Sequence, residues 1–549
     1  MTDDSKRPAV AAATRRSFAA AALVGAGIFL SRIVGLVRER VIATYFGTSL
    51  YADVFAAGLR MPNVLQNLLG EGTLSASFIP VYSELIGQGR TREAGRLAGA
   101  MFSLLLGIAG AISLIGVALA PVLVAVFTPG FEGERRELMI QLVRILFPMT
   151  GLLVLSAWAL GILNSHRKFF IPYFAPVLWN VAIVIAVIAF SFRDLSELLM
   201  AVGWGALVGG FLQFAIQLPW VLRLDREIRL NLGRDQPAFR EVLGNAIPAI
   251  MGRGVVQVSS YVDMVLASLL AIGAVAQLRY AQTLYVLPIS LFGMSVAAAE
   301  LPELARERHA AAEVLKGRTV AAIRRVAFFV VPSFVAFVLL GNVLVAGLYE
   351  AGEFTSANVA VVWFTLAAYS VGLLASTTTR IYQSAFFALR DTRTPARIAT
   401  LRVAVAALAG AFLMVQFEPI ALGPIAIPAG AFAGLTFEGI PLGPVGLAFG
   451  ASIGAWLEWA LLRARLRHQL GNVEAGASHY VRMFAAALAA AAAGYGAALA
   501  GRDWYPLVLA LLVGGVFGAV YFVAARLFGL EEARVIFESV ANRFRPRRA

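Results

Sequence analysis

The chain has 549 residues, of which 60% are hydrophobic and 14% are charged, whereas a soluble domain is about half apolar and a quarter charged. The excess apolar surface must face lipid, because single soluble cores are limited in size. The chain contains no cysteine, which excludes disulfides and cysteine-based metal sites. Its four scattered histidines indicate neither a metal centre nor a histidine general base.

Hydropathy predicts fourteen membrane-spanning helices, because a span needs roughly 20 mostly apolar residues. We expect the second, third and seventh to tenth of them to tilt, bend or project beyond the bilayer, since each is long for a single crossing. In chain order, the predicted spans are residues 17–40, 51–82, 96–127, 138–163, 171–190, 197–222, 242–272, 274–304, 320–348, 357–388, 397–416, 441–464, 480–500 and 504–528.

Basic residues concentrate in alternate loops and predict the topology. The two tails and the even-numbered loops are rich in Arg and Lys, whereas residues 417–440 contain neither. The third loop departs from the pattern with Arg135 and Arg136, although three glutamates offset them. By the positive-inside rule both termini are cytoplasmic, so the number of spans is even. The net charge of +14 therefore reflects topology, and we expect no nucleic-acid partner.

A faint internal repeat predicts two lobes. The segments from Gly47 to Pro62 and from Gly273 to Pro288 have the same length, and each contains a Tyr-Ala pair. They lie six predicted spans apart, so the repeat is parallel, about an axis normal to the membrane. We expect a cytoplasmic tail at residues 1–16, an N-lobe at 17–230 and a C-lobe at 231–470. Two further helices would follow at 471–530, and a basic cytoplasmic tail at 531–549.

Several ionisable residues interrupt the predicted spans. Such residues cost a few kcal/mol each on insertion scales and usually face an interior cavity. We therefore predict a water-filled cavity with a cationic bias, where guanidinium groups could each bind two oxygens of a phosphate. The candidate substrate-binding residues are Arg32, Arg38, Arg60, Arg253 and Arg380, and Asp263 is a candidate ion or proton carrier. Alternatively, the arginines lie at interfaces or pair with Glu39, Asp53 and Glu71.

No sequence pattern indicates an enzyme. The nucleotide-binding pattern G-x-x-x-x-G-K-[ST] is absent, so we expect neither ATP nor another cofactor. There is also no Ser/His/Asp or metal-binding constellation. Transport would then draw on an ion gradient, the membrane potential or a substrate gradient.

Short motifs follow one another in order along the chain, beginning with the string Ser31-Arg32-Ile33-Val34-Gly35-Leu36-Val37-Arg38-Glu39. This string resembles the first-helix signature S-R-x-x-G-x-x-R-[DE] of the MurJ/MviN family, the proposed lipid II flippases of peptidoglycan synthesis. Similar strings follow in order as far as Arg390-Asp391-Thr392-Arg393-Thr394-Pro395, among them Asp53-Val54-Phe55, Met61-Pro62-Asn63, Gly70-Glu71-Gly72, Phe78-Ile79-Pro80-Val81 and Gly352-Glu353-Phe354-Thr355.

The resemblance implies a MOP-exporter fold, an all-α polytopic membrane protein with two six-helix lobes around a central cavity. Its two additional C-terminal helices would form a groove for a polyprenyl tail. The implied cargo is lipid II, an undecaprenyl-pyrophosphate-linked disaccharide pentapeptide, and the implied location is the bacterial inner membrane. We expect gating or orienting roles for Ser31, Glu39, Asp53, Asn63 and Glu71.

Two departures from the family pattern concern the cavity charge. Gln66 and Thr283 stand where family members usually carry arginine. We predict that Arg253, near the middle of the seventh span, takes over part of this charge. The eleventh span offers few polar residues, so we expect weak or absent sodium coupling.

Three other functions remain as alternatives. The first is a MOP-type exporter of another undecaprenyl-linked saccharide, or a drug/cation antiporter. The second is a transport-dead scaffold that binds cell-wall synthesis proteins, which the missing arginines would favour. The third is a membrane-embedded glycosyl- or phosphotransferase, for which no catalytic acidic pair stands in an aqueous loop. Membrane lipids are expected neighbours in every case.

Overall fold

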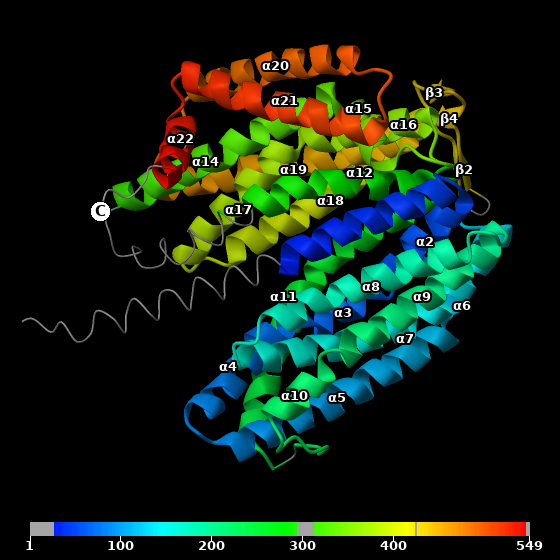
Figure 1. The fold of residues 1–549 in the computed structure, drawn as a ribbon, viewed down its shortest axis with the longest axis vertical. Coiled ribbons are helices and arrows are strands. Elements are labelled where there is room, and N and C mark those ends of the chain that lie inside the picture. The colour runs from blue at the N-terminus through cyan, green and yellow to red at the C-terminus, as the bar shows by residue number, and fades with distance from the viewer. Residues whose placement is uncertain are drawn as a thin grey trace, which may run out of the picture. The chain divides into compact units, whose positions relative to one another are not determined.

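The structure is a computed structural model that describes residues 27–233, 235–293, 296, 312–422, 425–473 and 475–544. Its elements are almost all helices (Figure 1). Contacts divide the chain into two compact units, Met1–Val265 and Leu266–Ala549, each with an apolar core of its own.

In the first unit, α7 (Gly133–Ser165) is the central helix. It packs against α2, α4, α5 and α9, and 67% of its most apolar stretch is buried. The unit contains a first helix over residues 27–46, α2 (Leu50–Arg60), α3 (Asn63–Leu69), α4 (Glu71–Gly87), α5 (Thr91–Ala118), α6 (Ala120–Phe127), α8 (Phe170–Ala189), α9 (Leu195–Ala215), α10 (Leu218–Leu224) and most of α11 (Pro237–Ser268).

The second predicted span is broken twice, into α2, α3 and α4. Pro62 lacks the N–H that would continue α2. Gly70 has an extended backbone, with φ −82° and ψ −151°, and its N–H donates to the Gln66 carbonyl. A Cβ at position 70 would lie 2.2 Å from that carbonyl oxygen, so glycine is required there. The expected bend of this span is therefore a double break.

In the second unit, α18 (Arg393–Phe417) and α19 (Gly443–Leu470) form a close antiparallel pair. A Cβ at Gly450 would lie 2.3 Å from the backbone nitrogen of Gly410, so small residues let the two backbones approach. Two antiparallel hairpins, β1–β2 and β3–β4, lie in the connection between these helices.

The other elements of the second unit follow the predicted spans. Their bounds are α12 (Ala274–Pro288), the π-helical turn η1 (Ile289–Gly293), α14 (Ala312–Leu339), α15 (Gly341–Tyr349), α16 (Ser356–Val371), α17 (Leu373–Ala388), β1 (Ile420–Leu422), β2 (Ile425–Ile427), β3 (Thr436–Phe437), β4 (Ile440–Pro441), α20 (Ala477–Ala500), α21 (Pro506–Leu527) and α22 (Glu531–Phe544).

Ten helical stretches of the described residues are long and apolar enough to cross a membrane. They correspond to the third to sixth and the ninth to fourteenth predicted spans. Those outside this set, the first, second, seventh and eighth, contain most of the predicted ionisable site residues. The prediction of an all-α polytopic membrane protein is confirmed.

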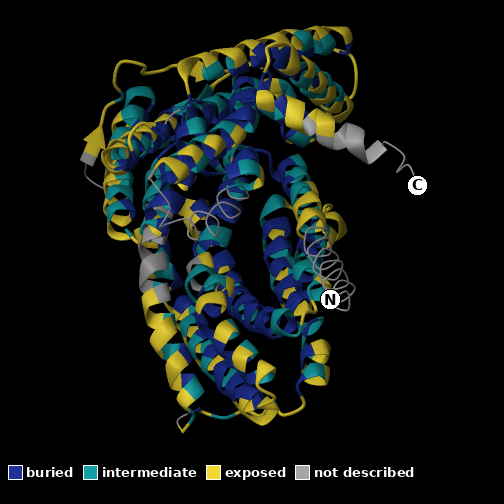
Figure 2. Cartoon of the chain, turned by 90° about the vertical axis from the view of Figure 1, so that its left-hand side faces the viewer, coloured by how far each residue is buried: buried dark blue, intermediate teal, exposed yellow. Residues whose placement is uncertain are grey.

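Burial follows the expectation for a protein surrounded by lipid. Large apolar side chains are exposed on outward helix faces, among them Ile185, Trp204 and Phe211 of α8 and α9. Figure 2 shows buried residues concentrated where helices pack together and exposed residues on the other faces. These outward faces therefore suit contact with acyl chains.

Along the chain, the division between the two compact units falls after Val265, within α11. The predicted lobes of residues 17–230 and 231–470 were drawn from hydropathy and the repeat, and they stay predictions, as do the tail boundaries. The tail at residues 1–16 lies outside the described residues.

Candidate functional site

On the first helix, Arg38 and Glu39 form an ion pair. Glu39 is buried, and the Arg38 guanidinium lies 4.8 Å from the ring centroid of Trp179 on α8. A carboxylate and an aromatic face thus restrain the Arg38 side chain from two sides. The alternative that Arg38 pairs with Glu39 is confirmed, and the role of Arg38 in substrate binding stays a prediction.

Asp53 on α2 is fully buried and accepts a 2.6 Å hydrogen bond from Arg135 Nη2 on α7. The guanidinium of Arg135 also lies over the Phe131 ring, 3.6 Å from its centroid. Asp53 was predicted to orient the arginines of the first two spans, and this role stays a prediction. The structure places a further arginine, Arg135, against its carboxylate. The signal for Arg135 was its departure from the alternation of charged loops.

Arg60 is half-buried at the end of α2, where the second span breaks. The Tyr261 hydroxyl of α11 donates to the carbonyl oxygens of Arg60 and Met61, at 3.4 Å and 3.3 Å. Because the last carbonyls of a helix have no partner within it, Tyr261 stabilises this helix end. Arg60 thereby stands at a fixed point where α2 and α11 meet.

The remaining predicted residues of the first unit are placed as follows. Ser31 and Asp263 are half-buried, whereas Arg32, Asn63 and Glu71 are exposed. Arg253 belongs to α11, and its side chain lies outside the described residues. Its compensating role, and the ion-carrying role of Asp263, stay predictions.

Arg380 belongs to the second unit and is exposed on α17. The predicted arginine sites are therefore distributed over both units. In the described part of the chain, no group of three or more His, Asp or Glu residues is placed to hold a metal ion.

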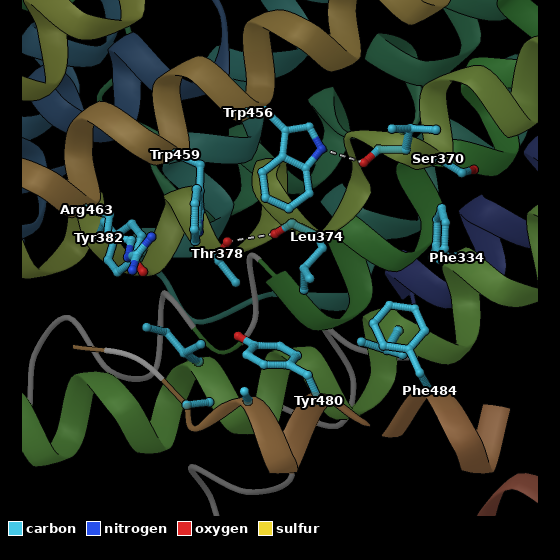
Figure 3. Close-up of a pocket in the computed structure, with 15 residues that line it drawn as sticks. Phe334, Ser370, Leu374, Thr378, Tyr382, Trp456, Trp459, Arg463, Tyr480 and Phe484 are labelled. Atoms are coloured by element: carbon cyan, nitrogen blue, oxygen red, sulfur yellow. Dashed lines mark hydrogen bonds between the residues drawn. The ribbon is translucent and has the colours of Figure 1, made fainter. Parts of the chain in front are cut away.

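The second unit contains an apolar cavity of about 380 Å³ between α14, α16, α17, α19 and α20. Figure 3 shows Arg463 and Tyr382 together at one end of it, and Phe334 and Phe484 at the other. The Arg463 guanidinium lies 4.9 Å from the ring centroid of Trp459. This arrangement suits an amphiphile whose apolar part fills the cavity and whose anionic part meets Arg463.

Hydrogen bonds fix the walls of this cavity. Trp456 Nε1 donates to the Val371 carbonyl at 2.8 Å, and Thr378 Oγ1 donates to the Leu374 carbonyl at 2.7 Å. The polar groups of these two side chains thus bond to backbone carbonyls, which leaves this part of the lining apolar. The family resemblance implies a groove for a polyprenyl tail at α20 and α21, and α20 supplies Ala477, Tyr480 and Phe484 to this cavity.

Comparisons with known proteins agree with these features. The family model "Lipid II flippase MurJ" matches residues 42–515. A protein of Burkholderia cenocepacia with the same description is 33% identical over 393 residues, which are 70% of this chain and 75% of the relative.

The fold is also found among solved structures. A structure of lipid II flippase MurJ in an inward closed conformation has a TM-score of 0.70 and 23% identity, and the match covers 92% of this chain and 99% of that one. An inward-facing multidrug resistance MATE family transporter of the MOP superfamily has a TM-score of 0.59 and 17% identity, over 79% of this chain and 95% of the transporter. At these identities the likeness concerns the fold. The long family match establishes that the chain belongs to the MurJ family of lipid II flippases, which are transporters rather than enzymes.

Proposed function

We propose that this chain moves lipid II from the cytoplasmic to the outer leaflet of the bacterial inner membrane by alternating access. The observation that carries this proposal is the family match over residues 42–515, which includes α2, α7 and α17 with their charged side chains. Both termini would lie in the cytoplasm, as the distribution of basic residues predicts.

Charge supports a cargo with a pyrophosphate group. Moving such a group through a medium of low dielectric is unfavourable without matching cations. In the first unit, Arg32 is exposed, Arg60 is half-buried and Arg38 is restrained by Glu39 and Trp179. A planar guanidinium binds two phosphate oxygens at once, so these three arginines are the proposed pyrophosphate contacts of that unit.

The apolar cavity supports a cargo with a hydrocarbon tail. Its lining is mostly aromatic and aliphatic, and the hydroxyls of Ser370 and Thr378 bond to backbone carbonyls. Arg463, Tyr382 and Tyr480 form one polar end. We infer that a segment of the polyprenyl chain occupies this space, next to α20. Aromatic side chains, among them Trp456, Trp459 and Tyr480, surround this space (Figure 3).

Energy for transport would come from an ion gradient or the membrane potential, without ATP or another cofactor. Asp263 would carry the coupling ion or proton, and Arg253 would supply part of the charge absent at Gln66 and Thr283. These assignments rest on the position of the residues within the predicted seventh span.

A second candidate cargo is another undecaprenyl-linked saccharide. It is favoured by the state of α12, where Thr283 donates to the carbonyl of Arg279 and Gln282 donates to the Tyr369 hydroxyl. Thr283, which stands where family members usually carry arginine, and its neighbour Gln282 thus bond within the protein. A cavity without that arginine would select its head group differently from the relatives.

The test uses bacterial cells depleted of their own lipid II flippase. The native chain should restore growth and the labelling of lipid II at the outer face of the membrane. A chain that reaches the membrane at the level of the host flippase but restores neither would refute lipid II as cargo. Restored export of a different undecaprenyl-linked saccharide in matched cells would then favour the second candidate.

A further inference from the structure

A buried carboxylate in the second unit holds an arginine that the proposed function has not used. Glu458 of α19 is 1% exposed. Its Oε2 accepts a 2.7 Å hydrogen bond from Arg402 Nη1 of α18, and its Oε1 accepts a 3.0 Å hydrogen bond from Gln383 Nε2 of α17. One acidic group therefore ties three helices and fixes a guanidinium.

The arginine of this pair is not enclosed with its partner. The Arg402 side chain is 37% exposed, whereas Glu458 is almost fully buried. Within the described residues, Glu458 accepts the one hydrogen bond that Arg402 donates, while a guanidinium carries five N–H donors. The remaining donors are thus available to an incoming ligand.

A polar stripe on α17 runs beside the pair. Ser376, Arg380 and Gln383 are spaced four and three residues apart, so they share one helix face. Ser376 bonds the Tyr285 hydroxyl of α12 at 3.0 Å, and Gln383 bonds Glu458. Arg380 lies between these two fixed points and is exposed. Gln383, one helical turn after Arg380, and Arg402 of α18 both bond the carboxylate of Glu458, so Arg380 and Arg402 lie on neighbouring helices beside the same acidic group.

The depth of the two arginines is similar. Arg380 precedes the turn between α17 and α18 by about as many residues as Arg402 follows it. At ~1.5 Å per residue each lies roughly 14 Å from that turn, near the middle of a hydrocarbon core that is about 30 Å thick. Two guanidinium groups and one carboxylate leave a net positive charge, which repels a metal cation and attracts an anion.

We propose that Arg402 and Arg380 form a diphosphate-binding site of the second unit, with Glu458 as the positioning residue that fixes Arg402. This deepens the proposed transport of lipid II, on which it rests. The site supplies the second-unit charge that is missing at Thr283, two residues from Tyr285 on α12. The ligand class is an isoprenyl diphosphate, recognised through its phosphate oxygens.

The test separates binding from mere support of the fold. Arg402→Gln leaves Glu458 buried without its cation, so this variant should melt at a lower temperature than the native protein. The double variant R402Q/E458Q removes both charges and should recover the native melting temperature. We expect the double variant to remain at least tenfold slower in lipid II transport, because the cargo has lost a cation. Native transport in the stable double variant would show that the pair is structural and would overturn the proposal.

Matched variants refine the result. Arg397→Gln removes an exposed arginine of the same helix outside this cluster, and it should leave transport unchanged. Arg402→Lys keeps the charge without the planar fork and should recover part of the transport. Equal losses in R397Q and R402Q/E458Q would show a general effect of charge on α18, against a specific site.

Direct binding distinguishes this inference from the transport of lipid II itself. The purified native protein and R402Q/E458Q are titrated with farnesyl diphosphate and with inorganic pyrophosphate. Affinity for both ligands should fall at least tenfold in the double variant, because the phosphate group is common to them. Unchanged affinity, no binding to the native protein, or a loss confined to farnesyl diphosphate would overturn the site. If the native chain fails to transport lipid II in cells, the proposed function is wrong, whatever these titrations give.

Discussion

Arg135, at the start of α7, donates a 2.6 Å hydrogen bond to Asp53, whose side chain on α2 is fully buried. The two residues are 82 positions apart in the sequence. The pair joins the broken second span to the central helix of the first unit, so it fixes the start of the segment that carries Arg60.

Breaking this pair should destabilise the protein. Arg135→Gln leaves a buried carboxylate uncompensated, for which a loss of about 3–5 kcal/mol is expected. The double variant D53N/R135Q removes both charges and should recover much of that loss. Thermal unfolding in detergent measures both effects. Arg136→Gln, which changes an exposed neighbour, is the control, and equal melting of R135Q and R136Q would contradict the prediction.

The arginines of the first unit should be required for transport. Removing a hydrogen bond to a charged group costs about 1.5–3 kcal/mol, so Arg32→Ala, Arg38→Ala and Arg60→Ala should each reduce transport about tenfold or more. Arg38→Lys should recover only part of the activity, because lysine lacks the planar fork. Growth of flippase-depleted cells and outer-face labelling of lipid II report the outcome. Full activity of all three alanine variants would show that these residues are structural.

Filling the apolar cavity should block the polyprenyl tail. Ala477 lines the cavity at α20, and Ala477→Trp would occupy space that the tail needs. We expect slower transport with unchanged thermal stability. Ala485→Trp places the same side chain at an exposed position of α20 and is the matched control. Equal transport by the two tryptophan variants would mean that this cavity does not receive the tail.

Glu418 should make stability depend on pH. It follows the last residue of α18, accepts hydrogen bonds from the backbone N–H groups of Ala271 and Gly443, and is 6% exposed. Burial raises the pKa of this carboxyl, although the two N–H groups act in the opposite direction. The folded protein thus binds a proton more tightly than the unfolded chain. The stability that Glu418 contributes through this bound proton is complete below the ordinary carboxyl pKa. It is lost as pH rises through the raised pKa of the folded protein.

The measurement compares melting temperatures across mildly acidic to neutral buffers. Glu418→Gln removes the titrating charge and keeps an oxygen acceptor for one of the two N–H groups, while its amide nitrogen cannot accept from the other. This variant should therefore be less stable throughout, and its stability should vary less with pH. Glu438→Gln changes an exposed glutamate of the same connection and should follow the native curve. If the melting temperature of E418Q varied with pH as much as that of the native protein, Glu418 would not be the cause of the pH dependence.

Hydropathy and charge alternation were sufficient to predict an all-α membrane protein, because lipid imposes a length and composition on each crossing. The double break near Gly70 was foreseen only as a bend. A hydropathy window averages over the local steric clash that requires glycine at that position.

The charge pairs were harder to predict than the helices. Arg135 was counted with the third loop, because its partner Asp53 is distant in sequence. Glu458 was overlooked inside the twelfth predicted span, although an acidic residue there requires a partner. The eleventh span was considered only for its lack of polar sodium ligands. Arg402 of that span was therefore not considered as a partner of an acidic residue. The cavity could not be located from the sequence, since five helices contribute to it.

The division of the second span at Pro62 and Gly70 has a consequence for hydration. Irregular backbone at membrane depth is tolerated only where it is buried in protein or faces water, because acyl chains offer no hydrogen-bond partner. Asn63 and Glu71, the first residues of α3 and α4, are exposed, so this stretch must be reached by water rather than by lipid. Amide hydrogens at the start of α4 should therefore exchange with deuterated solvent well before those in the middle of α7.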